Sequence, residues 1–205
     1  MPSFRAVISP YITAWTAEQD LPNRIVQRRG IGYATELQTD RDLNGVLWQQ
    51  TPQRQGSGRP EFGRAHPLRQ RRAMELLLCQ VCGGPASRTG DGVLWLHRDH
   101  RDDWPGWPEG MASVEPPVCA SCVAVSLRHC PALRKGAVAV SVRDFPIAGV
   151  RGLLHRPGVW APAPVSVVNM AYEDPAVRWV QASALVRELR GCTLVEFEEL
   201  AGAVA

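Results

Sequence analysis

The amino-acid sequence predicts a mixed α+β protein in which a cysteine-rich region is embedded in a small domain with short strands and a C-terminal helix. The 205 residues are 45% hydrophobic and 21% charged. This composition supplies a folded core and excludes a chain that is disordered throughout, a collagen or a coiled coil. Segments typical of strands and helices follow one another without a regular βαβ alternation. Two CxxC pairs stand near the middle of the chain.

The first 50 residues are predicted to form a strand-rich segment. Residues 4–15, 24–37 and 45–50 contain β-branched or aromatic residues and are bounded by Pro, Gly or the Asn44-Gly45 pair, as strands and turns are. Residues 51–66 hold four Gly or Ser residues and two Pro but few apolar residues. That composition indicates a loop or linker.

A basic helix is predicted over residues 67–78. Pro67 stands where helices begin, and good helix formers follow it. We expect Arg69 and Arg72 to face solvent. The apolar residues expected on the buried side of this helix are Leu68, Met74, Leu77 and Leu78.

The C-terminal segment, residues 131–205, is predicted to mix strands with a helix and to pack with residues 1–50 as one domain. Residues 136–145 and 165–172 are typical of strands. Asp174 and Pro175 form an N-cap and first-turn pair, and Gly191 is typical of a helix end. A helix is therefore expected from Asp174 to about Arg190.

Four of the six cysteines form two CxxC pairs separated by 36 residues. Gly83 and Gly84 follow the first pair and give the backbone the freedom to fold around an ion. Two such pairs complete a closed tetrahedral set of thiolates, the usual form of a structural zinc site. The residues predicted to bind one zinc ion are Cys79, Cys82, Cys119 and Cys122.

Residues 79 to about 130 resemble the treble-clef zinc fingers. Together with the basic helix they are expected to form one unit, residues 67–130. A cysteine knuckle comes first, residues 92–100 are typical of the first strand of a hairpin, and the second CxxC pair leads into a helical segment that ends at Pro131. The resemblance implies that this helix supplies the last two ligands from its first turn. Cys130 and Cys192 are expected to be buried thiols, with Cys130 as an alternative ligand.

The segment His97–Asp103 carries five potential ligands or bases between the two CxxC pairs. It is similar to the finger of the HNH nucleases, which often place an Asp-His pair on a hairpin in this position. Asp99 and His100 stand there. The resemblance implies that His100 acts as a general base and that Asp99 binds a divalent ion.

The chain departs from the HNH pattern around the second CxxC pair. It lacks the Asn that precedes this pair in the family and the His that soon follows it, because the first histidine after the pair is His129. The alternative interpretation is that residues 97–110 form a solvated hairpin tip, with Trp104 and Trp107 packed against the turn.

A basic segment runs from Arg54 to Arg72. Its six arginines and one glutamate give a net charge of +5, whereas the whole chain carries +3. Guanidinium groups bind phosphate in a bidentate manner, so this segment is a candidate nucleic-acid contact. The alternative is an exposed helix face and a linker whose charges are solvated. Of the 23 basic residues, 22 are arginine. The codon usage of a GC-rich bacterium produces such an excess without any function. The residues proposed to contact nucleic acid are Arg64, Arg69, Arg71 and Arg72.

The sequence therefore predicts a zinc-stabilised intracellular binding protein whose partner is a nucleic acid or another protein. No P-loop, GxGxxG, GxSxG or HExxH motif is present, and no small-molecule substrate is evident. The alternatives are a metal-dependent nuclease that uses Asp99 and His100, or a protein–protein adapter. The first twenty residues lack the apolar core of a signal peptide and no run is long enough to cross a membrane, so a cytoplasmic location is expected.

Overall fold

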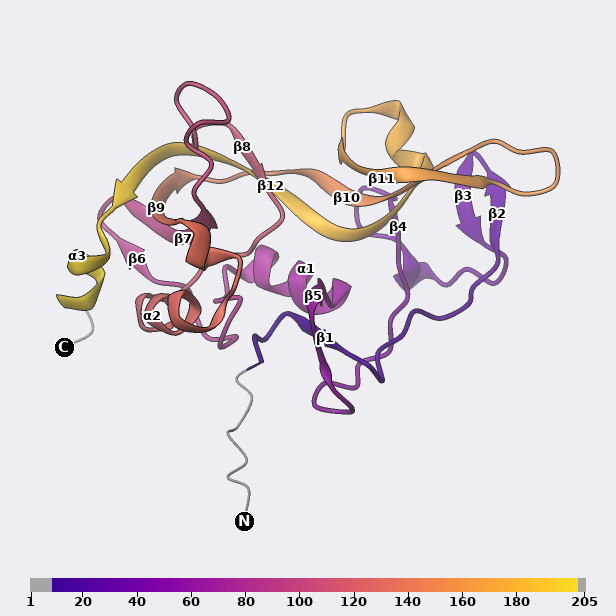
Figure 1. Cartoon of the computed structure of the whole chain (residues 1–205). Coiled ribbons are helices and arrows are strands. Elements are labelled where there is room, and N and C mark those ends of the chain that lie inside the picture. Colours follow the sequence, from indigo (N-terminus) through magenta and orange to yellow (C-terminus); the bar gives the residue numbers. More distant parts are fainter. Residues whose placement is uncertain (1–8, 203–205) are drawn as a thin grey trace, which may run out of the picture.

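The computed structural model describes residues 9–202 (Figure 1). Its longest element is strand β12 (Val180–Val195). β12 lies in an eight-stranded sheet and pairs with four other strands. The sheet has the order β11-β10-β12-β9-β7-β6, and β4 and β8 also pair with β12. Every pair is antiparallel except β4 with β12. The architecture is mixed α+β, as predicted.

Two small sheets and three α-helices accompany the large sheet within residues 9–202. β1 pairs with β5, and β2 pairs with β3. The other strands are β1 (Thr13–Trp15), β2 (Ile25–Arg28), β3 (Gly30–Tyr33), β4 (Leu47–Trp48), β5 (Pro60–Ala65), β6 (Arg88–Thr89), β7 (Gly92–Arg98), β8 (Met111–Ser113), β9 (Ala137–Asp144), β10 (Ile147–Arg156) and β11 (Ala163–Ala171). The helices are α1 (Pro67–Leu76), α2 (Ala120–His129) and α3 (Phe197–Gly202), and the 3-10 turns are η1 (Gln38–Asp40), η2 (Leu133–Lys135) and η3 (Pro175–Trp179).

Strands β9 and β10 behave as one interrupted strand along β12. β9 pairs with residues 190–195 of β12, and β10 pairs with residues 180–187 in the same direction. Pro146 stands at the interruption, where it offers no N–H to the ladder. Its carbonyl still accepts a hydrogen bond from the N–H of Glu188 at 3.1 Å. The resulting ribbon joins the two ends of the sheet.

The predicted helix from Asp174 to about Arg190 is wrong. The Asp174 carboxylate does accept a hydrogen bond from the N–H of Ala176 at 2.8 Å, but only the short turn η3 follows before β12 begins. Buried Val180, Ala182 and Ala184 alternate with less buried residues in this stretch. A period of two buries one face of a strand, and pairing along both edges of β12 overrides the local preference for helix. The helix nearest the C-terminus is α3 instead.

Most of the other predicted elements are confirmed within the described residues. Strands occur in each N-terminal segment, although residues 4–8 of the first one lie outside the described part, and β9, β11 and α2 match their predictions. The predicted loop over residues 51–66 is wrong in its second half, which forms β5. Residues 92–98 form the second strand of the β6–β7 hairpin rather than a first strand, and β10 was not predicted.

Helix α1 packs beneath the middle of β12 (Figure 1), and its buried side differs from the predicted one. Arg69, Gln70, Ala73 and Met74 are buried, whereas Leu68 is 37% exposed. The expectation that Leu68 faces the core and Arg69 faces solvent is therefore wrong. The polar side chains turn inward because each finds charged or backbone partners there, which offsets the cost of burying them.

Gln70 fastens α1 to β12 by hydrogen bonds to the strand's own backbone. Its Oε1 accepts from the N–H of Leu185 at 2.9 Å, and its Nε2 donates to the carbonyls of Leu185 at 3.0 Å and Val114 at 2.7 Å. Arg187 on β12 donates in return to the carbonyl of Met74 near the end of α1, at 2.7 and 3.1 Å. These hydrogen bonds fix the position of α1 along β12 and its rotation about its own axis.

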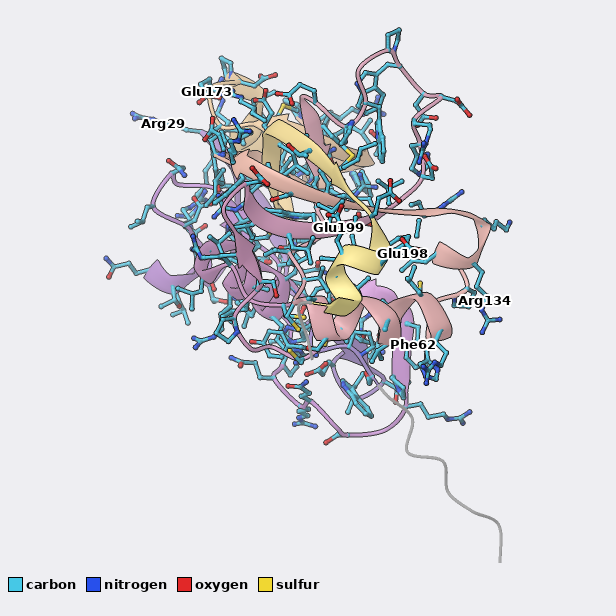
Figure 2. The ribbon with its side chains drawn as sticks, turned by 90° about the vertical axis from the view of Figure 1, so that its left-hand side faces the viewer. Arg29, Phe62, Arg134, Glu173, Glu198 and Glu199 are labelled. Atoms are coloured by element: carbon cyan, nitrogen blue, oxygen red, sulfur yellow. The ribbon has the colours of Figure 1, made fainter. Side chains whose placement is uncertain are left out.

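Helix α3 packs on α2 at one end of the molecule, where Glu198 and Glu199 project from α3 (Figure 2). Leu200 of α3 is buried in a cluster with Cys79, Cys122 and Val123. No helix among residues 9–202 is both long enough and apolar enough to span a membrane.

We predict that Gln70→Ala lowers the free energy of unfolding by roughly 2–3 kcal/mol, because it leaves the buried backbone groups of Leu185 without their partner. Urea denaturation followed by circular dichroism measures this change. Gln53→Ala, on an exposed side chain, serves as the matched control. A Gln70→Ala variant as stable as this control would contradict the role assigned to Gln70.

Candidate metal centre and basic segment

Four cysteine sulfurs converge at the end of the sheet that carries β6. The Sγ atoms of Cys79, Cys82, Cys119 and Cys122 all lie within 4.8 Å of one another. Cys79 and Cys122 are buried, whereas Cys82 is exposed. Four sulfurs this close form a site that could hold a metal ion, and the structure brings together the four cysteines that the spacing predicted. Cys130 is not a member of this group.

The first pair is shaped by a tight turn. The N–H of Gly83 donates to the carbonyl of Cys79 at 2.8 Å, and the N–H of Cys79 donates to the carbonyl of Gly84 at 2.7 Å. Gly83 has a φ of 74°, a left-handed conformation that favours glycine. A side chain at Gly83 would also meet the ring of Tyr11 at 2.9 Å. This turn directs both sulfurs of the first pair toward the second pair.

The second pair lies at the start of α2. Cys119 is the N-cap residue and Cys122 lies in the first turn. Ser87 holds this end of the helix, because its Oγ accepts a hydrogen bond from the N–H of Ala120 at 2.9 Å. The N–H of Gln80 donates to the carbonyl of Pro117 at 2.9 Å. These hydrogen bonds connect the segment of the first pair to the segment of the second pair.

The thiols of this group have perturbed acidities. Burial raises the pKa of Cys79 to about 11 and also raises the pKa of Cys122. Burial acts in the same direction on Cys119, but hydrogen bonds with Ser121 and Cys122 outweigh it and lower the pKa of Cys119 to about 7. Metal-bound thiols are deprotonated, and a divalent cation offsets the cost of ionising them in a buried site.

Cys192 stands apart from the metal group and contacts a different part of the chain. Its Sγ lies 3.8 Å from the carbonyl of Pro108, and burial together with the charge of Glu109 raises its pKa to about 12. An unreactive thiol is the expected state of such a cysteine.

The polar segment between the CxxC pairs does not converge on one point. His97 is buried, and its Nδ1 lies 2.5 Å from Oε2 of Glu115. Asp99 pairs with Arg101 at 2.9 Å. Within residues 9–202, no segment outside the four cysteines forms a group of three or more metal-ligating side chains.

His100, the candidate general base, contacts a neighbour rather than Asp99. Its Nδ1 lies 3.2 Å from Oδ2 of Asp103; the His100 side chain is partly exposed and that of Asp103 is exposed. Trp107 of the same segment is buried and Trp104 is 37% exposed. The tip is therefore anchored by one tryptophan, while Asp99 and His100 each have a separate partner.

Arg69, which the sequence assigned to a basic surface, forms a buried ion pair with Glu18. Its guanidinium donates to the two carboxylate oxygens of Glu18 at 2.8 and 2.6 Å and to the carbonyl of Thr13 at 2.8 Å. The backbone N–H groups of Trp15 and Arg54 also donate to Glu18, at 2.9 and 2.8 Å. Burial would raise the pKa of Glu18, but the hydrogen bonds from Arg69 and the two backbone groups lower it to about 2.

Arg64 and Arg71 also contact other parts of the chain. Arg64 pairs with Glu61 at 2.6 Å and donates to the carbonyl of Glu18 at 2.7 Å. Arg71 pairs with Glu75 at 2.9 Å, and its guanidinium lies 4.7 Å from the ring centroid of Trp48. Counter-charges from outside the basic segment therefore neutralise part of it.

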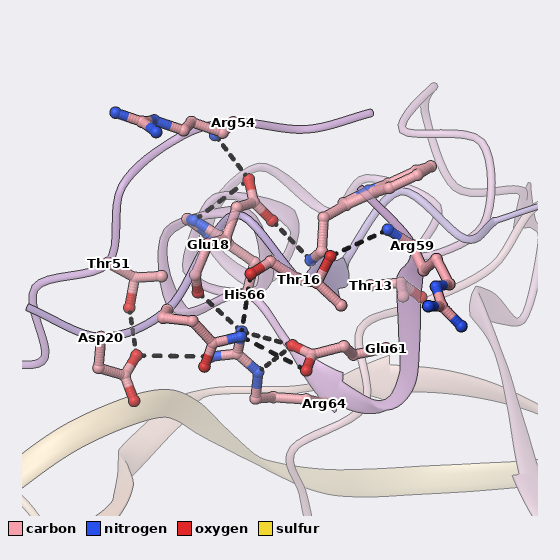
Figure 3. Close-up of polar contacts among 12 residues, drawn as sticks. Thr13, Thr16, Glu18, Asp20, Thr51, Arg54, Arg59, Glu61, Arg64 and His66 are labelled. Carbon is pink, nitrogen blue, oxygen red and sulfur yellow. Dashed lines mark hydrogen bonds and ion pairs between the residues drawn. The ribbon is translucent and has the colours of Figure 1, made fainter. Parts of the chain in front are cut away.

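Arg72, Arg54 and Arg59 are the exposed arginines of the basic segment. Figure 3 shows the side chains of Arg54 and Arg59 pointing away from the Glu18 network. Phe62 on β5 is 63% exposed and lies at the surface (Figure 2). Neither Glu18 nor Phe62 was predicted from the sequence. The excess of arginine over acidic residues in the basic segment indicated that a carboxylate from elsewhere in the chain could pair with it. The sequence pattern did not identify Glu18 as that carboxylate.

Comparison with known proteins found no match to this chain among family models, curated proteins or solved structures. The chemistry of the site must therefore be derived from its own residues.

We predict that Glu18→Gln lowers the free energy of unfolding at pH 7 by about 3–5 kcal/mol, because Arg69 then remains buried without a counter-ion. In the native protein, Glu18 has a folded pKa of about 2 against an ordinary value of 4.5. Its stabilisation is complete above about pH 4.5 and is lost as the pH falls toward 2, since the unfolded state binds the proton first.

Chemical denaturation at pH 7 and at pH 3 tests this prediction. The difference between the native protein and Glu18→Gln should shrink at the lower pH. Glu61→Gln is the control, because Glu61 forms a partly exposed pair with Arg64 and its loss should cost less than about 1 kcal/mol. Equal stabilities of the two variants at pH 7 would refute the buried ion pair.

Proposed function

We propose that the protein is a zinc-stabilised binding protein in which the four cysteines hold one structural Zn²⁺. The convergence of their sulfurs within 4.8 Å carries this proposal. Four sulfurs about 2.3 Å from a tetrahedral Zn²⁺ lie about 3.8 Å apart, and the sulfurs of Cys82 and Cys119 are 3.8 Å apart. A donor set of four thiolates favours zinc over hard cations such as Mg²⁺.

The proposed ion has a structural role rather than a catalytic one. Catalytic zinc sites keep one position open for water or substrate, whereas four thiolates fill all four positions. The order of elements also supports a treble-clef arrangement, because the knuckle at Cys79 is followed by the β6–β7 hairpin and then by α2. Zinc bound here would join the knuckle to α2 and complete the apolar cluster beneath them.

We predict that Cys79→Ser and Cys119→Ser each reduce the zinc content of the purified protein from one ion per chain toward zero. Each variant should also lower the Tm, because zinc binding contributes directly to the folding of such sites. Inductively coupled plasma mass spectrometry and a thermal melt measure the two effects. Cys130→Ser, outside the group, is the control and should retain its zinc. Full zinc retention and an unchanged Tm in both ligand variants would refute the site.

We further propose that the binding partner is single-stranded nucleic acid. Arg54, Arg59 and Phe62 support this partner, since exposed arginines and an exposed aromatic ring lie within nine residues of chain. Guanidinium groups contact the phosphate backbone, and aromatic faces stack on unpaired bases. Arg72 adds positive charge from α1. Arg64, Arg69 and Arg71 would instead support this surface from within, through the ion pairs described above.

We predict that the double substitution of Arg54 and Arg59 by Ala weakens binding of a single-stranded oligonucleotide and lowers its salt dependence, by about 0.7 in the log–log slope for each lost phosphate contact. Phe62→Ala should weaken binding with little change in that slope, because stacking releases no counter-ions. Fluorescence anisotropy at several salt concentrations separates the two effects.

Arg29→Ala provides the matched control, because Arg29 is an exposed arginine of the β2–β3 turn. This variant should bind as the native protein does. If the native protein shows no salt-dependent binding to any oligonucleotide, the nucleic-acid proposal fails and a protein partner is favoured. The zinc measurement is independent of that outcome.

A further inference from the structure

Strand β11 forms an open edge of the eight-stranded sheet. β10 lies along one side of it, and in the part of the chain that the structure describes no strand pairs with the other side. An edge of this kind presents a row of backbone N–H and C=O groups that another strand can pair with. β11 is nine residues long, from Ala163 to Ala171, which is enough for a regular ladder.

Most of β11 lacks the usual protection of an edge. Natural proteins guard such strands with charged residues, proline, bulges or shortness. Pro164, which has no N–H, and the register shift that skips Val165 protect only the start of the strand. The nine residues of β11 carry no charged side chain. Val165 and Val167 are 54% and 57% exposed. A long, uncharged and partly apolar edge favours pairing with a further strand.

We propose that β11 pairs antiparallel with β11 of a second copy of this chain and forms a two-fold symmetric dimer with one continuous sheet. Charged residues next to the two ends of β11 are the reason for this choice of partner and direction. Arg156 of β10 lies opposite Ala163 at the start of β11, while Glu173 and Asp174 follow its last residue. Both Arg156 and Glu173 are exposed.

Antiparallel pairing brings the start of each β11, next to Arg156, against the end of the other β11, next to Glu173. Arg156 then lies near Glu173 of the second copy, and two-fold symmetry repeats the contact at the other end. A parallel arrangement would instead place the two arginines together and the two glutamates together. Figure 2 shows Glu173 at the surface of the molecule, where such a contact is accessible.

The loop that precedes β11 supplies a second reason for this pairing. Val159 and Trp160 are 92% and 94% exposed at its tip, although large apolar side chains are favoured in buried positions. The loop is held near β2, since the N–H of Gly158 donates to Oε1 of Gln27 at 3.3 Å. Pairing centred on Val167 brings Trp160 toward the turn after β11 in the second copy. The loop tip of each copy, with Val159 and Trp160, would thus cover the C-terminal end of β11 in the other copy.

Sedimentation equilibrium of the full chain over a range of concentrations tests the proposal. The native protein should approach twice its 22.5 kDa mass. Val167→Lys places two lysines face to face on the symmetry axis and should raise the dissociation constant at least tenfold, while circular dichroism stays unchanged. Leu43→Lys, at a fully exposed position before β4, is the matched control and should dimerise normally. A monomeric native protein at all concentrations overturns the proposal.

A charge reversal tests the antiparallel register without altering β11 itself. Arg156→Glu and Glu173→Arg should each weaken the dimer, and the double variant should restore it because both contacts are then re-formed with opposite signs. A dimer that is indifferent to these changes, or that persists in Val167→Lys, uses another surface and refutes the inference. Pairing with a strand of a different protein would leave the native chain monomeric and would appear as the same negative result.

Discussion

The pairing of β12 with the interrupted strand β9–β10 is the constraint on which the rest of the structure depends. This ribbon runs from the Val180 end to the Val195 end of β12, and three apolar clusters made of different residues pack along it. Gln70 and Arg187 attach α1 to its middle. Because backbone groups carry most of these contacts, the arrangement tolerates many side chains but not a change of register.

Local signals in the sequence predicted the features that depend on neighbours in the chain. The CxxC spacing identified the four-cysteine group because a tight turn is enough to bring two thiols together. Pro67 and the helix formers after it located α1, and Pro131 marked the end of α2. Val180 to Arg190 is the opposite case. Its Ala, Leu, Arg and Glu residues favour a helix in isolation, and Gly191 resembles a helix end. Partners on β10 that lie 26 or more residues earlier in the chain make this stretch a strand, and no local pattern records them.

The basic segment shows the same limit for charge. Counting residues from 54 to 72 gave a surplus of positive charge, yet Arg69 pairs with Glu18, 51 residues earlier, and Arg71 pairs with Glu75 just beyond the segment. A buried guanidinium needs a partner that satisfies its hydrogen bonds as well as its charge. The choice of Glu18 depends on how β1 and β5 fold over α1, so it follows from tertiary structure. What remains at the surface is a smaller set of arginines than the sequence indicated.

The edge strands at the two ends of the large sheet differ in whether other parts of the chain cover them. The four-cysteine group lies at the covered end, and β11 forms the uncovered one. At one end, β6 is only two residues long, and the edge of β7 is covered by backbone hydrogen bonds of Leu94 with Ser87 at 3.0 Å and with Val118 at 2.8 Å. These two covering residues belong to the segments that carry the two cysteine pairs, so the proposed metal would also hold this cover on the edge of β7. At the other end, β11 has no such cover within the described residues. A sheet covered at one end by the two cysteine-bearing segments keeps β11 as a free edge within the described residues, and beyond Pro164 the strand carries no charged side chain that would oppose a second strand.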